Sequence, residues 1–179
     1  PISDGAAAAI LCREEELDRF DRSRAVKIHA TALRTGSDRD PQEFDRHITH
    51  LAARDAYARA GLGPEDMHVA EVHDATAFAE IQQVENLGFC DFGEGGALTE
   101  SGATSIGGRI PVNLSGGLES KGHPVGATGL AQVFELTTQL RGEAGARQVA
   151  NAKFAIAENG GGFHGIEEAV ACVTILGRT

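Results

Sequence analysis

Glycine is concentrated in one part of this 179-residue chain, and this concentration limits what the chain can fold into. Eleven of the 23 glycines lie in residues 93–129, and three more are consecutive at residues 160–162. Glycine weakens regular helices and strands, but it lets the backbone turn sharply and approach another group closely. The distribution therefore predicts ordered elements joined by glycine-rich loops whose backbone lies close to another group, and it does not indicate a uniformly flexible chain.

Charge and composition exclude several classes of protein. The chain has 16 Lys and Arg against 26 Asp and Glu, a formal net charge of −10, and only 5% aromatic residues. Because nucleic-acid-binding proteins need basic surface and stacking platforms, nucleic acid is not an expected partner. No apolar run approaches the roughly eighteen residues of a membrane-spanning helix, and no secretory signal pattern is present. We therefore expect no membrane partner and a cytoplasmic location.

The cysteines suggest neither a disulfide framework nor a metal site. Cys12, Cys90 and Cys172 are odd in number, widely spaced and form no Cys-x-x-Cys pair. Zinc sites and disulfide-rich domains need closely or regularly spaced cysteines. We therefore expect reduced thiols and no bound metal.

Strands and helices are predicted to alternate along the chain. Residues 25–33 alternate in polarity and contain β-branched side chains, as a half-buried strand does. A helix is expected to begin with Asp40 as its cap, Pro41 in its first turn and Glu43 completing a capping box, and to end at Gly61. Further strands are expected at residues 6–12, 67–72, 153–157 and 170–176, and further helices at residues 75–87 and 128–141. Residues 13–20 are expected to form a short helix or a linker. This alternation predicts an α/β fold in which helices cover a sheet.

His73 and Asp74 lie at the junction between an expected strand and the helix that follows it. In α/β folds, functional side chains collect just beyond the carboxyl end of a strand. The alternative is that His73 packs under a loop or caps the helix, and that Asp74 serves as a helix cap. The position by itself leaves both interpretations open.

His123 lies between Gly122 and Pro124, immediately before an expected helix, within the glycine-rich segment 113–129. The positive end of a helix dipole opposes protonation, so a histidine there tends to stay neutral. A neutral imidazole can act as a general base or as a hydrogen-bond donor. A turn with no chemical role is the alternative.

Residues 157–165 contain Glu158, Asn159 and three consecutive glycines between the last two expected strands. Glycines at a strand end can let backbone N–H groups point into a site as an oxyanion hole. The alternative is a tight hairpin with no catalytic meaning.

Together these segments resemble the C-terminal half of the thiolase superfamily. Residues 107–129 match, almost residue for residue, the signature of the branch that includes sterol-carrier-protein-type thiolases and acetyl-CoA acetyltransferases, and residues 139–149 also fit. Residues 4–8 resemble the Asp-Gly-Ala-Ala-Ala strand that closes the N-terminal half of such proteins. The resemblance implies that residues 1–22 are the end of that first half, its last strand and linker. Residues 23–179 would then form the C-terminal domain, a mixed five-stranded sheet layered with helices.

The resemblance also implies a mechanism. A cysteine in the first half takes up an acyl group from coenzyme A, a histidine matching His123 activates that thiol, and a histidine matching His73 helps to bind the thioester oxygen as it becomes an enolate. Acyl-CoA is then a substrate, and no permanently bound cofactor is expected. Contacts with this substrate are expected from Asn113, Ser115, Gly116, Gly117, Lys121, Gly122, Gly160, Gly161 and Gly162.

Departures from the family pattern leave the reaction open. The nucleophilic cysteine's segment is absent, and Ala75 occupies the position of a cysteine in the His-Asp-Cys-Phe motif. Glu158 or Asn159, depending on the register, stands where a second cysteine would be, so we expect Glu158 to transfer the proton. The three existing cysteines are interpreted as packing residues.

Three functions follow from this comparison. The first is an acyltransferase that lacks its first half here. The second is a retro-aldolase for steroid or aromatic CoA thioesters, and the third is a non-catalytic CoA-binding or assembly subunit. The expected partners are an N-terminal thiolase half, further copies or subunits in an oligomer, and a small OB-fold companion that binds acyl-CoA.

Overall fold

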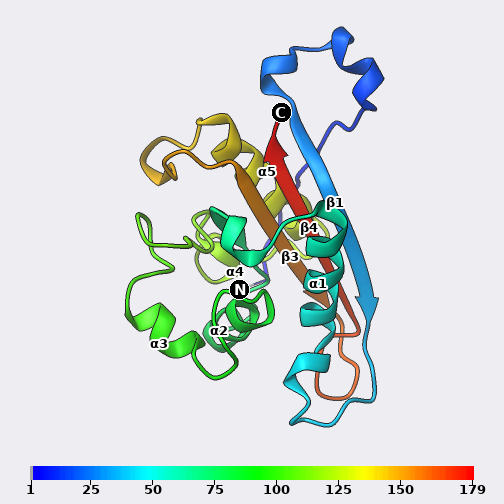
Figure 1. Ribbon diagram of the computed structural model, residues 1–179, viewed down its shortest axis with the longest axis vertical. Coiled ribbons are helices and arrows are strands. Elements are labelled where there is room, and N and C mark those ends of the chain that lie inside the picture. The colour runs from blue at the N-terminus through cyan, green and yellow to red at the C-terminus, as the bar shows by residue number, and fades with distance from the viewer. Residues whose placement is uncertain (1) are drawn as a thin grey trace.

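One mixed sheet organises the chain in the computed structural model, which describes residues 2–179 (Figure 1). Its strands are β1 (Val26–Thr35), β2 (Val69–Glu71), β3 (Phe154–Gly161) and β4 (Val170–Arg178), in the order β1-β4-β3-β2. The β1–β4 and β3–β4 pairs are antiparallel, and the β2–β3 pair is parallel. The expected α/β fold with a mixed sheet is confirmed.

The expectation of a fifth strand is wrong, because its place is occupied by a single parallel bridge between Ala70 and Val112. The N–H of Ala70 donates to the carbonyl of Pro111, and the N–H of Asn113 donates to the carbonyl of Ala70, each at 2.9 Å. The pairing cannot extend, because Pro111 has no N–H to donate and Asn113 leaves the extended conformation with a φ of 53°.

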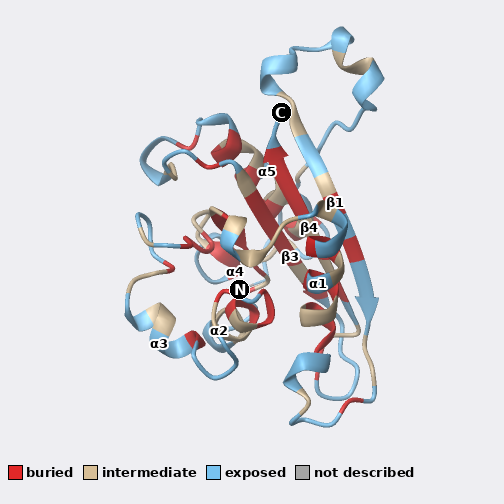
Figure 2. Cartoon of the chain, viewed as in Figure 1, coloured by how far each residue is buried: buried red, intermediate tan, exposed pale blue. Residues whose placement is uncertain are grey.

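Helices cover both faces of the sheet. Helix α1 (Ile48–Ala60) packs against β1 and β4, and α5 (Thr128–Arg141) packs against β3 and β2 on the other face. The α1 side holds a core that includes Ala52, Ile156 and Val173, and the α5 side holds one that includes Leu136 and Ala155. Figure 2 shows that the buried residues are concentrated in the strands and in the helix surfaces that face them.

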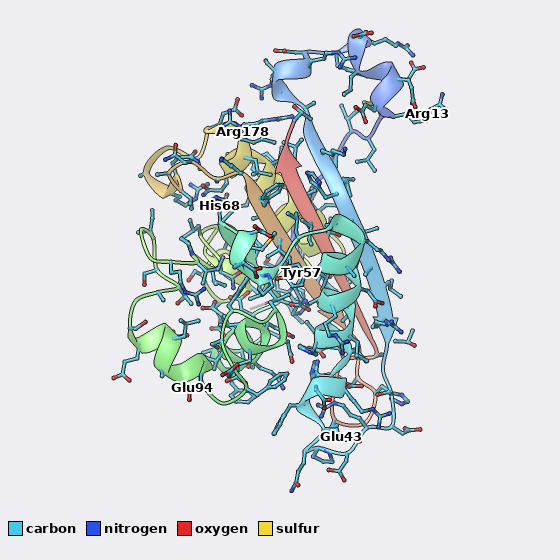
Figure 3. The ribbon with its side chains drawn as sticks, viewed as in Figure 1. Arg13, Glu43, Tyr57, His68, Glu94 and Arg178 are labelled. Carbon is cyan, nitrogen blue, oxygen red and sulfur yellow. The ribbon has the colours of Figure 1, made fainter. Side chains whose placement is uncertain are left out.

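Three shorter α-helices complete the layers: α2 (Ala77–Asn86), α3 (Gly95–Glu100) and α4 (Gly117–Lys121). Helices α3 and α4 lie in the region expected to be glycine-rich loop, so that region is more regular than its composition indicates. Helix α2 is joined to α1 by the hydroxyl of Tyr57, which donates to the carbonyl of Leu87 at 2.9 Å (Figure 3). Short 3₁₀ turns lie at Glu14–Arg19, Arg22–Arg24, Phe44–Arg46, Pro64–Asp66 and Gly145–Arg147.

The helix expected from Asp40 begins later, at Ile48. The N–H of Asp40 does bond to the carboxylate of Glu43 at 2.9 Å, as a capping box requires. However, the Arg39 guanidinium donates to the carbonyl of Asp40 at 3.2 Å, and His47 is extended with a ψ of 134°. The carbonyl of Asp40 thus accepts Arg39 and, in a single turn, the N–H of Glu43, and the helical ladder starts at the carbonyl of His47, which accepts the N–H of Leu51 at 3.0 Å. The end of the helix is as expected, because Gly61 adopts a φ of +67°.

The strand expected at residues 6–12 is not formed. The segment has no strand partner among residues 2–179, and its Ile10 and Leu11 are 88% and 75% exposed. An isolated extended segment has no ladder of hydrogen bonds to stabilise it. Cys12 is also exposed, so its interpretation as a packing residue is wrong, whereas Cys90 and Cys172 are partly buried.

A buried ion pair joins the segment after β1 to the connection between β3 and β4. Arg39 Nε lies 2.7 Å from Glu167 Oε2, and the two side chains are only 4% and 0% exposed. The same carboxylate accepts the backbone N–H groups of Ser37 at 2.9 Å and Ile48 at 3.3 Å. Glu167 thus holds the start of α1 against the sheet.

Substituting Arg39→Ala is expected to lower the free energy of unfolding by about 3–5 kcal/mol, because it leaves the buried Glu167 carboxylate without its cation. Arg46→Ala is the control: it breaks an exposed pair with Glu43, and a change of about 0–1 kcal/mol is expected. Urea unfolding of both variants measures the difference. Equal effects of the two substitutions would contradict the assignment of Arg39 to the fold.

Candidate active site

His73 and His123 lie together, although fifty residues separate them in the chain. Their ring centroids are 5.1 Å apart, and the ring planes meet edge to face at 76°. His73 follows β2, and His123 lies between α4 and α5. The carboxyl end of a parallel strand and the start of a helix therefore present both imidazoles at one edge of the sheet.

The contacts of His123 favour one of its tautomers. Its Nδ1 lies 2.7 Å from the hydroxyl of Thr128, in the first turn of α5. Both contacts of that hydroxyl are hydrogen bonds when it donates its only proton to the carbonyl of Pro124, 3.2 Å away, and accepts a proton from Nδ1 of His123. The neutral ring then keeps an unprotonated Nε2, which can take up a proton.

His73 has the opposite arrangement. The side-chain amide nitrogen of Asn159 lies 3.2 Å from Nδ1 of His73, and because an amide N–H only donates, Nδ1 is the acceptor. The neutral ring therefore carries its proton on Nε2. Burial lowers the pKa of His73, and the neighbouring His123 lowers it further, so the neutral form is favoured.

Asp74 ties the end of β2 to α4. Its carboxylate accepts the N–H of Leu118 at 2.7 Å, whereas the helix that follows it, α2, is capped by Thr76. Gly117 has a φ of +59°, and a Cβ there would overlap the Asp74 carboxylate. Glycine at this position is required by the turn and by the close approach of Asp74.

Ser115, Lys121 and Glu71 form a chain of polar contacts under the loop that leads to His123. The hydroxyl of Ser115 donates to Glu71 at 2.5 Å and accepts from the Lys121 ammonium at 2.6 Å. Glu71 is 0% exposed, and burial raises its pKa to about 6. The Lys121 ammonium is thus directed toward the interior.

Asn113, Gly116 and Gly122 shape the same loop. The side chain of Asn113 accepts the N–H of Val72 at 2.8 Å and donates to Glu80 at 2.8 Å. Gly116 and Gly122 adopt φ values of +98° and +95° at the two ends of α4. These residues fix the path of the backbone between β2 and His123.

Glu158 is hydrogen-bonded to the backbone of His73. Its carboxylate accepts the backbone N–H of His73 at 2.9 Å and does so from a fully buried position. Burial raises the pKa of Glu158 to about 8, and Glu168 and Asp74 also act to raise it. Near neutral pH, Glu158 is therefore mainly a protonated carboxylic acid.

The three consecutive glycines do not form the expected turn. Gly160 and Gly161 continue β3 and pair with Ala171 and Val170 of β4. The connection between the strands starts only at Gly162, which has a φ of +69°. The strand continues because β4 offers a pairing partner at these positions, and an extended glycine fits that ladder.

Asn159 and Thr128 are the site residues that the sequence analysis did not select. Asn159 appeared there only as a possible register for a missing cysteine, and it is the residue whose side chain contacts the His73 ring. The alternation of side chains along β3 is the feature that could have identified Asn159. Ile156 belongs to the core on the α1 side, and Ala155 and Ala157 belong to the core on the α5 side. Asn159 therefore faces α5, whereas Glu158 faces α1.

The N-terminal segment reaches the site. The N–H of Ser3 donates to the carbonyl of His123 at 3.2 Å, and Gly5 packs against the ring of Pro124. An open cavity of about 390 Å³ lies between residues 3–7 and 124–127. Within residues 2–179, no cluster of three or more His, Cys, Asp or Glu side chains could hold a metal ion. In the same residues, no helix combines the length and the apolar character needed to cross a bilayer.

The comparisons with known proteins agree on one family. Residues 30–178 match the family described as thiolase C-terminal domain-like. An acetyl-CoA acetyltransferase of Methanothermobacter thermautotrophicus is 48% identical over 99% of this chain and 46% of its own length. Sterol carrier protein 2 of Rattus norvegicus is 46% identical over 89% of this chain and 30% of its own length.

A solved structure described as an Ltp2-ChsH2(DUF35) aldolase is also similar. It superimposes with a TM-score of 0.70 at 26% identity, over 86% of this chain and 39% of that chain. The present chain thus spans less than half the length of each of these proteins.

The free energy of unfolding is expected to fall as the pH rises from about 5 to 8. In that range the unfolded chain releases the proton of Glu158 and the folded protein retains it. The contribution of Glu158 to the free energy of unfolding is therefore fully present below pH 4.5 and is lost as the pH rises through about 8. Glu158→Gln should flatten this dependence, most clearly above about pH 7, where Glu71, with a pKa of about 6, is mainly ionised. Urea unfolding at several pH values tests this, with Glu100→Gln on the exposed end of α3 as the control.

Proposed function

Because the chain belongs to the thiolase C-terminal domain-like family, we propose that it supplies the second half of an acyltransferase that forms or cleaves carbon–carbon bonds in coenzyme A thioesters. The observation that carries this proposal is the adjacent histidine pair, because the contacts with Thr128 and Asn159 favour opposite tautomers of the two imidazoles. One ring offers a lone pair at Nε2 and the other offers a proton at Nε2.

The two tautomers suit two different tasks. His123, with its free Nε2, takes the proton of a cysteine thiol supplied by the first half, and the resulting thiolate attacks the thioester carbonyl carbon. As the carbon–sulfur bond to coenzyme A breaks, the imidazolium returns the proton to the leaving thiolate. His73, with its proton on Nε2, donates a hydrogen bond to the thioester oxygen when negative charge develops there.

Glu158 is the proposed proton-transfer group. Its burial favours the protonated acid at neutral pH, so it holds a proton that can be delivered and later recovered. Its contact with the N–H of His73 keeps it adjacent to the site. A carboxylic acid with a pKa near the working pH can transfer protons in both directions.

The substrate is proposed to be an acyl-CoA thioester, with no permanently bound cofactor. The loop that carries Asn113, Ser115, Gly116, Gly117, Lys121 and Gly122 leads directly into His123, and it would lie beside the thioester. Gly160, Gly161 and Gly162 remain proposed contacts from the end of β3. Because the ammonium of Lys121 bonds to Ser115, we propose that Lys121 acts mainly by holding this loop.

The first partner we propose is an N-terminal thiolase half, with residues 1–22 as its end. Residues 6–12, which form no strand in this chain alone, would become its last strand by pairing with the sheet of that half. On α5, Leu130 and Phe134 are 43% and 64% exposed, while the polar Gln132 is buried. Ile10 and Leu11 are also exposed. A second α/β layer over these side chains would bury this apolar surface. A homo- or hetero-oligomer and a small OB-fold companion that binds acyl-CoA are further proposed partners.

A retro-aldolase is the second candidate, and the likeness to a solved aldolase favours it. Ala75 follows Asp74 where a second cysteine would assist thiolysis, so a reaction that does not use free coenzyme A is compatible with this site. The substrates would be steroid or aromatic acyl-CoA thioesters. A third candidate, a non-catalytic CoA-binding or assembly subunit, requires that the histidine pair has no role in turnover.

His123→Ala in the full-length protein is expected to lower turnover of an acyl-CoA substrate by about 10²–10⁴-fold, because the general base is lost. Thr128→Val should cause a smaller loss, since the base remains and only its tautomer is released. Steady-state kinetics with acetoacetyl-CoA and with a steroid acyl-CoA measures both, and His50→Gln on α1 is the control. Unchanged turnover in His123→Ala would reject both catalytic candidates and favour the binding subunit.

Product analysis separates the two reactions. An acyltransferase working in the cleavage direction is expected to consume one free coenzyme A for each carbon–carbon bond broken. A retro-aldolase is expected to release a ketone or aldehyde without consuming free coenzyme A. Mass spectrometry of the products, with and without added coenzyme A, decides between them.

A further inference from the structure

Glu168 is a half-buried carboxylate near Glu158, and the function proposed above does not use it. It lies at the end of the connection between β3 and β4, and its side chain packs over Gly160. A Cβ on Gly160 would be only 2.8 Å from Cγ of Glu168. Gly160 follows Glu158 by two residues on the same face of β3, a spacing of roughly 7 Å. The absence of a side chain at Gly160 thus brings the two carboxyl groups together.

Neutral groups hold Glu168 in place. The amide of Gln83, which is fully buried in α2, donates to Glu168 Oε1 at 2.9 Å. Nε2 of His47 lies 3.6 Å from Glu168 Oε2, but burial lowers the pKa of His47 and favours its uncharged form. The neighbouring Glu167, in contrast, is paired with Arg39. The charge of Glu168 is therefore not matched by an arginine or lysine among residues 2–179.

Each of the two carboxyl groups has one oxygen without a partner. Within residues 2–179, Glu158 Oε1 and Glu168 Oε2 are buried and make no hydrogen bond. Two neighbouring carboxylates whose unpaired oxygens are out of contact with water ionise together at neutral pH only at a cost, so one of them is expected to keep its proton. Glu158 is the group that keeps it, because Glu158 is fully buried whereas the side chain of Glu168 is 23% exposed to water.

We propose that Glu168 is a positioning residue for Glu158. Because Gly160 has no side chain, the carboxylate of Glu168 can lie near Glu158, and its negative charge keeps Glu158 in the acid form. The role of Glu158 in proton transfer belongs to the proposed function, and this inference rests on it. The titratable groups that face Glu168 are Glu158 on β3, His73 after β2 and His47 before α1, with Glu167 next to it in the chain. Gly160 thereby acts by making room for a side chain.

Infrared titration of the full-length protein, with ¹³C-labelled glutamate side chains, tests this without any substrate. The wild-type protein should show a carboxylic acid band near neutral pH that is absent in Glu158→Gln. In Glu168→Gln, which keeps the shape of the side chain but removes its charge, the midpoint of that band should move to lower pH by about one unit. Gly160→Ala should move it in the same direction, because the added methyl group displaces Glu168.

Glu100→Gln is the matched control, since it removes the same charge from an exposed position on α3. Identical midpoints in Glu168→Gln and Glu100→Gln would overturn the inference, as would the lack of an acid band in the wild-type protein. If Glu168→Gln does not fold, the midpoint of Gly160→Ala decides in its place. A shifted midpoint in a protein that turns over no acyl-CoA would contradict the proposed function and leave the carboxylate pair intact.

Discussion

Buried carboxylates that accept backbone N–H groups hold the loops of this protein on its sheet. Glu71 binds the N–H of Ser115, Asp74 that of Leu118, Glu158 that of His73, and Glu167 those of Ser37 and Ile48. A buried carboxylate is costly unless it is hydrogen-bonded, so each of these contacts specifies one arrangement of the two segments that it joins. Part of the acidic character of the chain is therefore internal and structural.

The same interaction has opposite consequences at two positions. Burial acts to raise the pKa of Glu167, but hydrogen bonds from Ser37, Arg39 and Ile48 outweigh it, so the net pKa is lowered and the group stays charged. Among residues 2–179, Glu158 accepts a single hydrogen bond and forms no ion pair, so burial dominates and its pKa is raised. One carboxylate thus stabilises the fold as an ion, and the other favours its protonated form at the backbone of His73.

Hydrophobic periodicity and helix-capping residues in the sequence predicted much of the fold. The strand at residues 25–33 and the helix at residues 128–141 lie where they were expected, since alternation and helical spacing are local properties. The delayed start of α1 was not predictable, because it depends on Arg39 and its distant partner Glu167. The missing strand at residues 6–12 has a similar cause, because a strand requires a neighbour that the sequence pattern does not specify.

The sequence by itself determined the α/β class, the order of the main elements, and the placement of His73 and His123 at the ends of a strand and a loop. Only the tertiary structure decided the hydrogen-bond partner of Nδ1 in each histidine, because α5 brings Thr128 to the ring of His123 and β3 brings Asn159 to the ring of His73. It also decided that Asn159 contacts the His73 ring while Glu158 binds its backbone. Successive residues of a strand face opposite sides of the sheet, and what each side holds depends on how the helices pack.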